Sequence, residues 1–251
     1  MMQLNQQIQG NGHLNKEAGD ATRLSLPIDG QGNQYHNAQL DDYGDLRRGA
    51  LPWRAGVRLE LEAQFSHGVD ELVGTAGFGF WNAPYGRGVA LPQAVWFFFA
   101  SEPNNLPLNK NGAGRGWFAS TIDAGSWRAK RLIPLAPLAL VGNQFGRIQN
   151  TIMPPIMNQL GISFQPLTVP ITQRNRYALE WQKNGSCFYI NDQIVFQTNH
   201  SPRGPLGFIA WIDNQYAIVT PRGNLRAGAL KIPQTQWLEV GEIDIKPCGN
   251  T

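Results

Sequence analysis

The chain has 251 residues, of which 42% are hydrophobic, 28 are glycine and 17 are proline. Lys and Arg number 21 against 18 Asp and Glu, and a net charge of +3 is too small to indicate a nucleic-acid-binding surface. No apolar run reaches the ~18 residues of a membrane span, and residues 1–16 lack the apolar stretch of a signal peptide, so a cytoplasmic location is expected.

Residues 1–21 form a polar N-terminal extension, either frayed or paired at a sheet edge, and residues 22–251 are expected to form a single β-sandwich domain. In Val57–Phe65 apolar and polar residues alternate, as in a half-buried strand. Lys183-Asn-Gly-Ser186 predicts a hairpin turn, because Asn-Gly favours the tight turns that join antiparallel strands. The predicted strands are 23–27, 35–41, 57–65, 74–81, 94–100, 116–122, 177–182, 187–190, 194–197, 207–213, 217–220 and 237–245.

Residues 132–170 interrupt this series of strands. Arg147 is their only charged residue, several prolines divide them, and Leu138, Val141, Phe145 and Ile148 recur at helical spacing. We expect an apolar, partly helical insertion with Phe145 and Ile148 buried. Such an insertion could seal one end of the sandwich, or it could be a lid with an apolar underside over a binding groove.

About a dozen short strands with little helix between them predict an all-β antiparallel sandwich or barrel. Three segments (74–81, 176–199 and 204–214) resemble the concanavalin A-like lectin/glucanase superfamily, and the resemblance extends over about 57–245. It implies a jelly roll of two curved antiparallel sheets, with a ligand on the concave sheet. The superfamily includes laminarinase-type glycoside hydrolases, whose signature is Glu-x-Asp-x-x-Glu; here Glu242 and Asp244 match its start, but Pro247 stands at the third position, so we expect this motif not to be catalytic.

Candidate catalytic carboxylates must therefore come from elsewhere. Asp213 and Glu102, and also Asp123, follow aromatic strands at the points where these run into loops, and functional residues often collect at such places. Each could instead cap a turn by accepting hydrogen bonds from nearby backbone N–H groups. The four histidines are isolated from one another in the sequence, and no Ser-His-Asp spacing is apparent.

The candidate ligand-binding residues are aromatic, because aromatic rings stack on the C–H faces of sugars and on flat apolar ligands. In 207–213, Phe208, Ala210 and Ile212 are expected to enter the core, since burying Asp213 unpaired would cost several kcal/mol. That places Trp211 and Asp213 on the groove side. Gly77 and Gly79 would leave a trough in front of Trp81. The candidate ligand-binding set is Trp81, Trp96, Trp117, Trp211 and Tyr216, with Arg115 and Asn214 as polar contacts.

No cofactor is predicted. Calcium is conceivable through Asp41 and Asp42, but a solvated pair beside an edge strand is the favoured interpretation. Whether Cys187 and Cys248 form a disulfide is left open, because spacing alone does not decide it. The sequence also leaves the oligomeric state open.

Three functions remain as hypotheses. The first is a module that binds or processes a saccharide in an aromatic-lined concave groove. The second is an enzyme of the isomerase, cyclase or hydrolase type that acts on an apolar small molecule under the 132–170 segment. The third is a structural module without a ligand. Whether any reaction is catalysed is not decided by the sequence.

Overall fold

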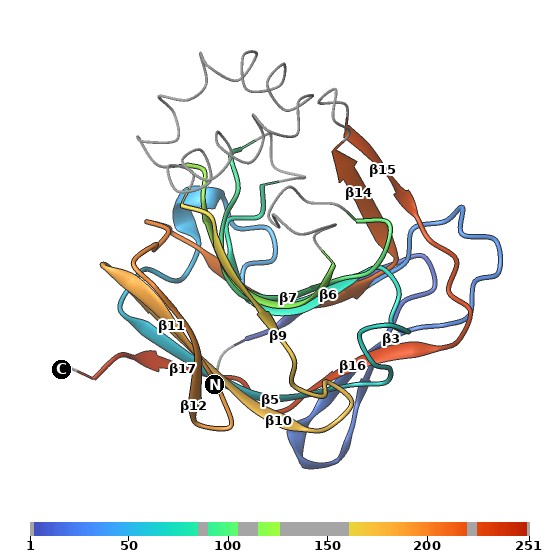
Figure 1. Ribbon diagram of the computed structural model, residues 1–251, viewed down its shortest axis with the longest axis horizontal. Coiled ribbons are helices and arrows are strands. Elements are labelled where there is room, and N and C mark those ends of the chain that lie inside the picture. The colour runs from blue at the N-terminus through green and yellow to red at the C-terminus, as the bar shows by residue number, and fades with distance from the viewer. Residues whose placement is uncertain (1–2, 85–89, 105–114, 126–160, 220–224, 250–251) are drawn as a thin grey trace.

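The computed structural model describes residues 3–84, 90–104, 115–125, 161–219 and 225–249. These residues form two curved antiparallel sheets that stack face to face, and a two-stranded hairpin rises at one end of the upper sheet (Figure 1). The predicted all-β sandwich is therefore confirmed. Two short 3-10 turns, η1 (Ala18–Asp20) and η2 (Arg48–Ala50), are the helical elements of the described part.

The seven-stranded sheet carries the groove, and we call it the concave sheet. From one edge to the other it runs β1 (Asn5–Gln9), β4 (Asn37–Asp41), β13 (Gly207–Asp213), β6 (Thr75–Trp81), β7 (Gln93–Ala100), β8 (Gly116–Asp123) and β9 (Ser163–Leu167). The hairpin of β14 (Gln215–Val219) and β15 (Leu225–Ala229) continues from β13, so that it stands beside the hollow of this sheet (Figure 1).

The eight-stranded sheet covers the back of the concave sheet, and we call it the convex sheet. Its strands are β12 (Gln193–Thr198), β11 (Gly185–Ile190), β10 (Asn175–Gln182), β5 (Val57–Phe65), β16 (Gln236–Val240), β3 (Thr22–Leu26) and β2 (His13–Lys16), with β17 (Asp244–Pro247) also paired to β5. The predicted hairpin turn is confirmed, because β10 ends at Gln182 and β11 begins at Gly185.

The core between the sheets is rich in aromatic rings. Phe78 of β6 packs against Tyr177 of β10 with ring centroids 5.0 Å apart, and Phe97 of β7 packs edge-on against Phe188 of β11 at 5.3 Å. Such pairs contribute about 0.5–1.5 kcal/mol each beyond the area they bury. The interlocked rings fix the two sheets, and therefore the curvature of the concave sheet, in one arrangement.

Several boundaries differ from the sequence-based expectation. The N-terminal extension adopts the paired one of its two expected arrangements, because β1 joins the edge of the concave sheet and β2 joins the edge of the convex sheet. The run 237–245 is two strands, since the chain leaves the ladder at Gly241 between β16 and β17. Residues 163–167 of the predicted insertion form β9, whereas Phe145, Ile148 and the rest of 126–160 lie outside the described residues.

The structure also answers the question of a disulfide, which the sequence left open. Cys187 and Cys248 are both free. None of the helical segments in the described ranges has the length and apolar character to cross a bilayer.

Candidate functional site

The floor of the groove is a cluster of aromatic rings on the outer face of the concave sheet. Trp96 of β7 lies at its centre, with ring centroids 5.3 Å from Trp211 of β13, 5.3 Å from Phe98 and 6.2 Å from Trp81 of β6. Trp81 and Trp96 are half-buried, whereas Trp211 is only 7% exposed and packs beneath its neighbours. Trp81 and Trp96 therefore offer the more accessible ring surfaces.

Two glycines on β6 make room for this cluster. A Cβ atom on Gly77 would lie 3.0 Å from Cη2 of Trp211, and one on Gly79 would lie 2.6 Å from Cβ of Trp96. Their backbones also lie opposite those residues in the sheet register. Gly77 thus leaves room for the indole of Trp211 over β6, and Gly79 allows the close approach of Cα and Cβ of Trp96. The indole of Trp211 occupies part of the space in which a trough in front of Trp81 was expected.

One wall of the groove consists of amide side chains from β1 and β4. Asn37 and Gln39 alternate along β4 on the groove side, opposite Asp213 and Trp211 of β13 in the register. Gln7 of β1 continues the row, since it lies opposite Gln39. Asn37 is 6% exposed and Gln39 9% exposed, so both amides are buried groups that border the groove.

Asp213 occupies one end of the groove. Its carboxylate accepts hydrogen bonds from the Thr75 hydroxyl at 2.8 Å, from the Gln215 backbone N–H at 3.0 Å and from the Tyr35 hydroxyl at 3.3 Å. Burial raises the pKa of Asp213 to about 6, although these hydrogen bonds act in the opposite direction. A carboxyl group with a pKa near neutrality can exchange protons at physiological pH.

The groove formed by these parts has a volume of about 730 Å³. Of the predicted site residues, Trp81, Trp96, Trp211, Tyr216 and Asp213 line it. As predicted, Phe208, Ala210 and Ile212 lie in the core between the sheets, while Trp211 and Asp213 lie on the groove side. The aromatic rings and the amides therefore lie side by side on neighbouring strands and line the same hollow.

Trp117 and Asn214 do not belong to the groove. Trp117 is 1% exposed and packs between the sheets against Phe65 and Phe78, because the residues of β8 that share its face point into the core. Asn214 is fully buried; its Oδ1 accepts from the His36 N–H at 2.8 Å and its Nδ2 donates to the Leu230 carbonyl at 2.8 Å. The prediction that Trp117 and Asn214 bind the ligand is therefore wrong, and both side chains are part of the packed interior.

Glu102 and Arg115 also lie away from the groove. They form an ion pair with each other, and both side chains are more than half exposed. They border a separate surface hollow near Val69–Val73. Neither lines the groove that contains Trp96. Asp123 is likewise outside the groove; burial raises its pKa, and its carboxylate accepts a hydrogen bond from the Gln93 amide at 2.6 Å.

Asp41 and Asp42, the two candidate calcium ligands, have different hydrogen-bond partners. Asp41 is buried beside the amide wall, and its oxygens accept from Gln7 and Gln39. Asp42 accepts from the Trp53 indole and from the Phe208 backbone N–H, and burial raises its pKa to about 6. Among the described residues no group of three or more His, Cys, Asp or Glu side chains converges on a metal position.

The residues that sequence reasoning missed are the amides. Asn37 and Gln39 lie in the predicted strand 35–41, but their amides were not assigned to the site, and Gln7 lies in the polar extension, for which no strand was specified. A weaker signal was present, because Asn37, Gln39 and Asp41 alternate, as do Asn5, Gln7 and Gln9. Residues that alternate along a strand share one face.

No family model matches the sequence, and no curated protein matches it. Solved structures do match. A prokaryotic β-1,3-1,4-glucanase (lichenase) derived from a mouse hindgut metagenome superposes with a TM-score of 0.54 at 10% identity, over 98% of this chain and 94% of that one. A native glycosidic hydrolase gives a TM-score of 0.52 at 10% identity, over 99% and 91% of the two chains.

A third structure is that of an immunostimulatory antigen and pseudo β-1,3-glucanase of Mycobacterium tuberculosis. Its TM-score is 0.51 at 9% identity, over 93% of this chain and 78% of that one. Identities this low show the fold alone. The chain therefore shares the two-sheet antiparallel jelly-roll fold of these three structures.

Proposed function

We propose that the chain binds a saccharide in the groove of the concave sheet. The observation that carries the proposal is the position of half-buried Trp81 and Trp96 beside buried amides that border the same hollow. Indole rings stack on the C–H faces of sugar rings, and amides exchange hydrogen bonds with hydroxyl groups. The resemblance of the fold to a β-1,3-1,4-glucanase supports a saccharide as the ligand class.

The described groove favours binding over hydrolysis by two carboxylates. Its acidic lining residues, within the described ranges, are Asp45 and Asp213. Asp213 lies opposite Asn37 at the start of β4, whereas Asp45 lies beyond the end of β4 at Asp41. Asn37 and Asp41 are four residue steps apart, about 13 Å at ~3.3 Å per residue, so Asp213 and Asp45 lie toward opposite ends of β4. A retaining glycosidase holds its two carboxylates about 5 Å apart.

A second candidate function is catalysis on an apolar small molecule. Asp213 favours it, because a carboxylate with a pKa of about 6 beside an aromatic floor has the properties of a general base. The amide wall favours the saccharide instead, since an apolar ligand would leave buried amides without hydrogen-bond partners.

The test is a binding screen with laminarin, barley β-glucan, xylan and glucomannan, measured by calorimetry or affinity electrophoresis. Trp96→Ala should weaken binding by about 10-fold or more, which is ~1.4 kcal/mol, because it removes the central ring of the floor. Trp237→Ala is the matched control, since this half-buried Trp lies on the convex sheet beneath the Arg23 guanidinium. If none of the four polysaccharides binds, or if both variants bind as the wild type does, the proposal fails.

A further inference from the structure

The amide wall is organised around a carboxylate that does not line the groove. Asp41 is 0% exposed, at the end of β4. Its Oδ2 accepts hydrogen bonds from Nε2 of Gln7 at 2.8 Å and from Nε2 of Gln39 at 2.9 Å. Because a carboxylate only accepts hydrogen bonds, both amides must turn their NH₂ groups toward Asp41.

This orientation decides which atoms the wall offers to a ligand. Nε2 of Gln39 also donates to the Tyr43 hydroxyl at 3.3 Å, so both of its protons are engaged. The Oε1 atoms of Gln7 and Gln39 accept no hydrogen bond from any described residue. Gln7 is an exposed residue that lines the groove. Gln39 also lines the groove, and its Oε1 is not among the buried unpaired polar atoms of the described part, so this oxygen is solvent-accessible.

The same network joins the wall to the aromatic floor. The Tyr43 hydroxyl, which accepts from Gln39, also accepts from Nε1 of Trp81 at 2.7 Å. The chain of hydrogen bonds therefore runs from Asp41 through Gln39 and Tyr43 to Trp81. A change at Asp41 would be transmitted to both surfaces that a ligand contacts.

We propose that Asp41 is a positioning residue that sets the hydrogen-bond polarity of the groove, so that its wall accepts hydrogen bonds from the hydroxyl groups of a neutral sugar. This inference rests on the proposed function. It deepens it by naming the chemistry recognised: an edge of the ligand that carries O–H donors. Ligands whose hydroxyls on that edge are replaced by ethers are excluded, since two acceptors would then face each other.

Asp41→Asn inverts this polarity without a large change of shape. Oδ1 of Asp41 accepts from the backbone N–H groups of Tyr43 at 3.1 Å and Gly44 at 2.7 Å, so the oxygen of the new amide must stay there. The new NH₂ group then takes the place of Oδ2, facing Gln7 and Gln39. Both glutamines must rotate to accept from it, which turns their own NH₂ groups toward the groove.

The experiment compares two probes on three proteins. The probes are gluco-, xylo- or manno-hexaose, whichever binds the wild type best, and its methyl-ether derivative, which accepts hydrogen bonds but does not donate them. We expect Asp41→Asn to raise the dissociation constant of the hydroxyl probe about 10-fold, because one to two hydrogen bonds are lost. The ratio of the two dissociation constants should change by a larger factor, in favour of the ether probe. Asp244→Asn on the convex sheet is the matched control, and it should change neither value.

A second variant tests the inference even if Asp41→Asn does not fold. Gln7→Met removes one acceptor from an exposed edge position and leaves the Asp41 contacts with Gln39, Tyr43 and Gly44 intact. It should weaken the hydroxyl probe about 3- to 10-fold. If Asp41 acts through Gln7, the effects of the two substitutions should not add in the double variant.

The outcomes separate this inference from the proposed function. The role of Asp41 is overturned if folded Asp41→Asn keeps the probe ratio of the wild type and Gln7→Met keeps its affinity. If Trp96→Ala nevertheless loses binding, the groove still stands as the binding site. A wild type that binds none of the hexaoses or polysaccharides overturns both. An inverted probe ratio in Asp41→Asn, or a loss in Gln7→Met, supports the inference.

Discussion

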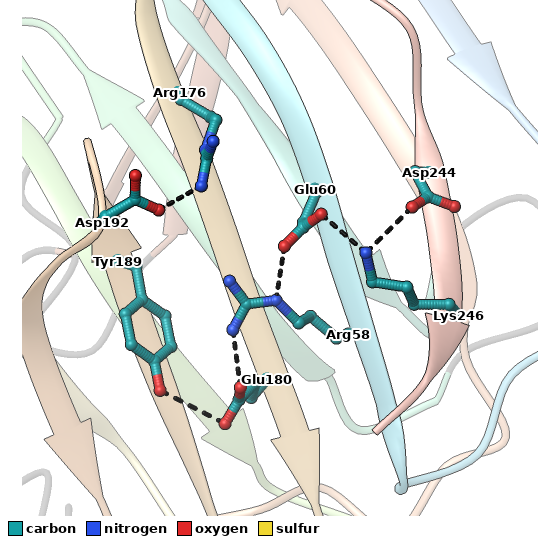
Figure 2. Close-up of polar contacts among 8 residues, drawn as sticks. All are labelled: Arg58, Glu60, Arg176, Glu180, Tyr189, Asp192, Asp244 and Lys246. Atoms are coloured by element: carbon teal, nitrogen blue, oxygen red, sulfur yellow. Dashed lines mark hydrogen bonds and ion pairs between the residues drawn. The ribbon is translucent and has the colours of Figure 1, made fainter. Parts of the chain in front are cut away.

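The two outer faces of the sandwich use their polar side chains in opposite ways. On the convex sheet, Arg58 of β5 binds Glu60 and Glu180 at 2.6 Å each, and Lys246 of β17 binds Glu60 at 2.8 Å (Figure 2). On the concave sheet the corresponding layer consists of amides and indoles that border an open groove. Charges on one face thus satisfy each other, while amide groups on the other face retain unused acceptors.

The register explains the difference. Glu180 of β10 lies directly opposite Arg58 of β5, so these opposite charges are cross-strand neighbours. Lys246 of β17 also lies opposite Arg58, but it pairs with Glu60, two residues further along β5. On the concave sheet, Gln39 lies opposite Trp211, which offers it no carboxylate or ammonium partner. A face whose polar groups are paired internally contributes to stability, whereas a face with unpaired groups is available for binding.

Among substitutions on the two faces, the largest change in the free energy of unfolding is expected at Asp213, on the concave sheet. Because burial raises its pKa from 3.8 to about 6, the folded protein holds this proton more tightly than the unfolded chain. The proton on Asp213 therefore contributes up to ~3 kcal/mol to the free energy of unfolding. This contribution is complete below about pH 4 and is lost as the pH rises through about 6. Asp213→Asn does not titrate, so its unfolding free energy should fall less steeply with pH over this interval.

Urea unfolding at pH 4, 5, 6 and 7 measures this slope. Asp42 has a raised pKa in the same window and remains in the variant, so the slope should be reduced but not abolished. Asp244→Asn provides the control on the convex face. Equal slopes for the wild type and Asp213→Asn would show that the pKa of Asp213 is not raised in the folded protein.

A smaller effect is expected when the convex network is broken. Arg58→Met should lower the free energy of unfolding by about 1 kcal/mol, because Glu60 and Glu180 lose their shared partner and the guanidinium leaves the Tyr189 ring, 4.9 Å away. The loss should shrink in 1 M salt, which screens such pairs. Saccharide binding should not change, and a parallel loss of binding would contradict the separation of the two faces.

Arg176→Met is the matched control for Arg58. Arg176 pairs with Asp192, and both side chains are more than half exposed (Figure 2). Its removal should cost less than ~0.5 kcal/mol, as is usual for a single exposed ion pair. An equal cost for Arg58→Met and Arg176→Met would indicate that the network adds nothing beyond isolated pairs.

The smallest effect is expected at the motif that resembles part of the glycosidase signature. Glu242 is exposed between β16 and β17, and Asp244 pairs with Lys246 on the convex sheet. Glu242→Gln should change the unfolding free energy by less than ~0.5 kcal/mol and leave saccharide binding intact. Loss of a glycosidase activity in this variant, with the fold preserved, would overturn the assignment of this motif to the outer surface.

Alternation in the sequence determined most of the strands and part of the site. The pattern of Val57–Phe65 matches β5, and 207–213 matches β13 with the predicted residues in the core. These predictions succeed because side chains alternate across a strand, so a single strand contains the information about which residues share a face. Trp211 and Asp213 were placed together on this basis.

For a strand such as β8, which has apolar residues on both faces, only the tertiary structure decided which face points outward. It also decided which strands become neighbours. Trp117 shares its face with Ala119, and nothing within 116–122 shows that this face enters the core rather than the groove. Gln7 belongs to the site only because β1 pairs with β4, residues about 30 positions away. Asp41 acquires its role from the donors that this pairing brings to it. Pairing between distant strands depends on the whole sheet, and for that reason the amide wall could not be deduced from its own segments.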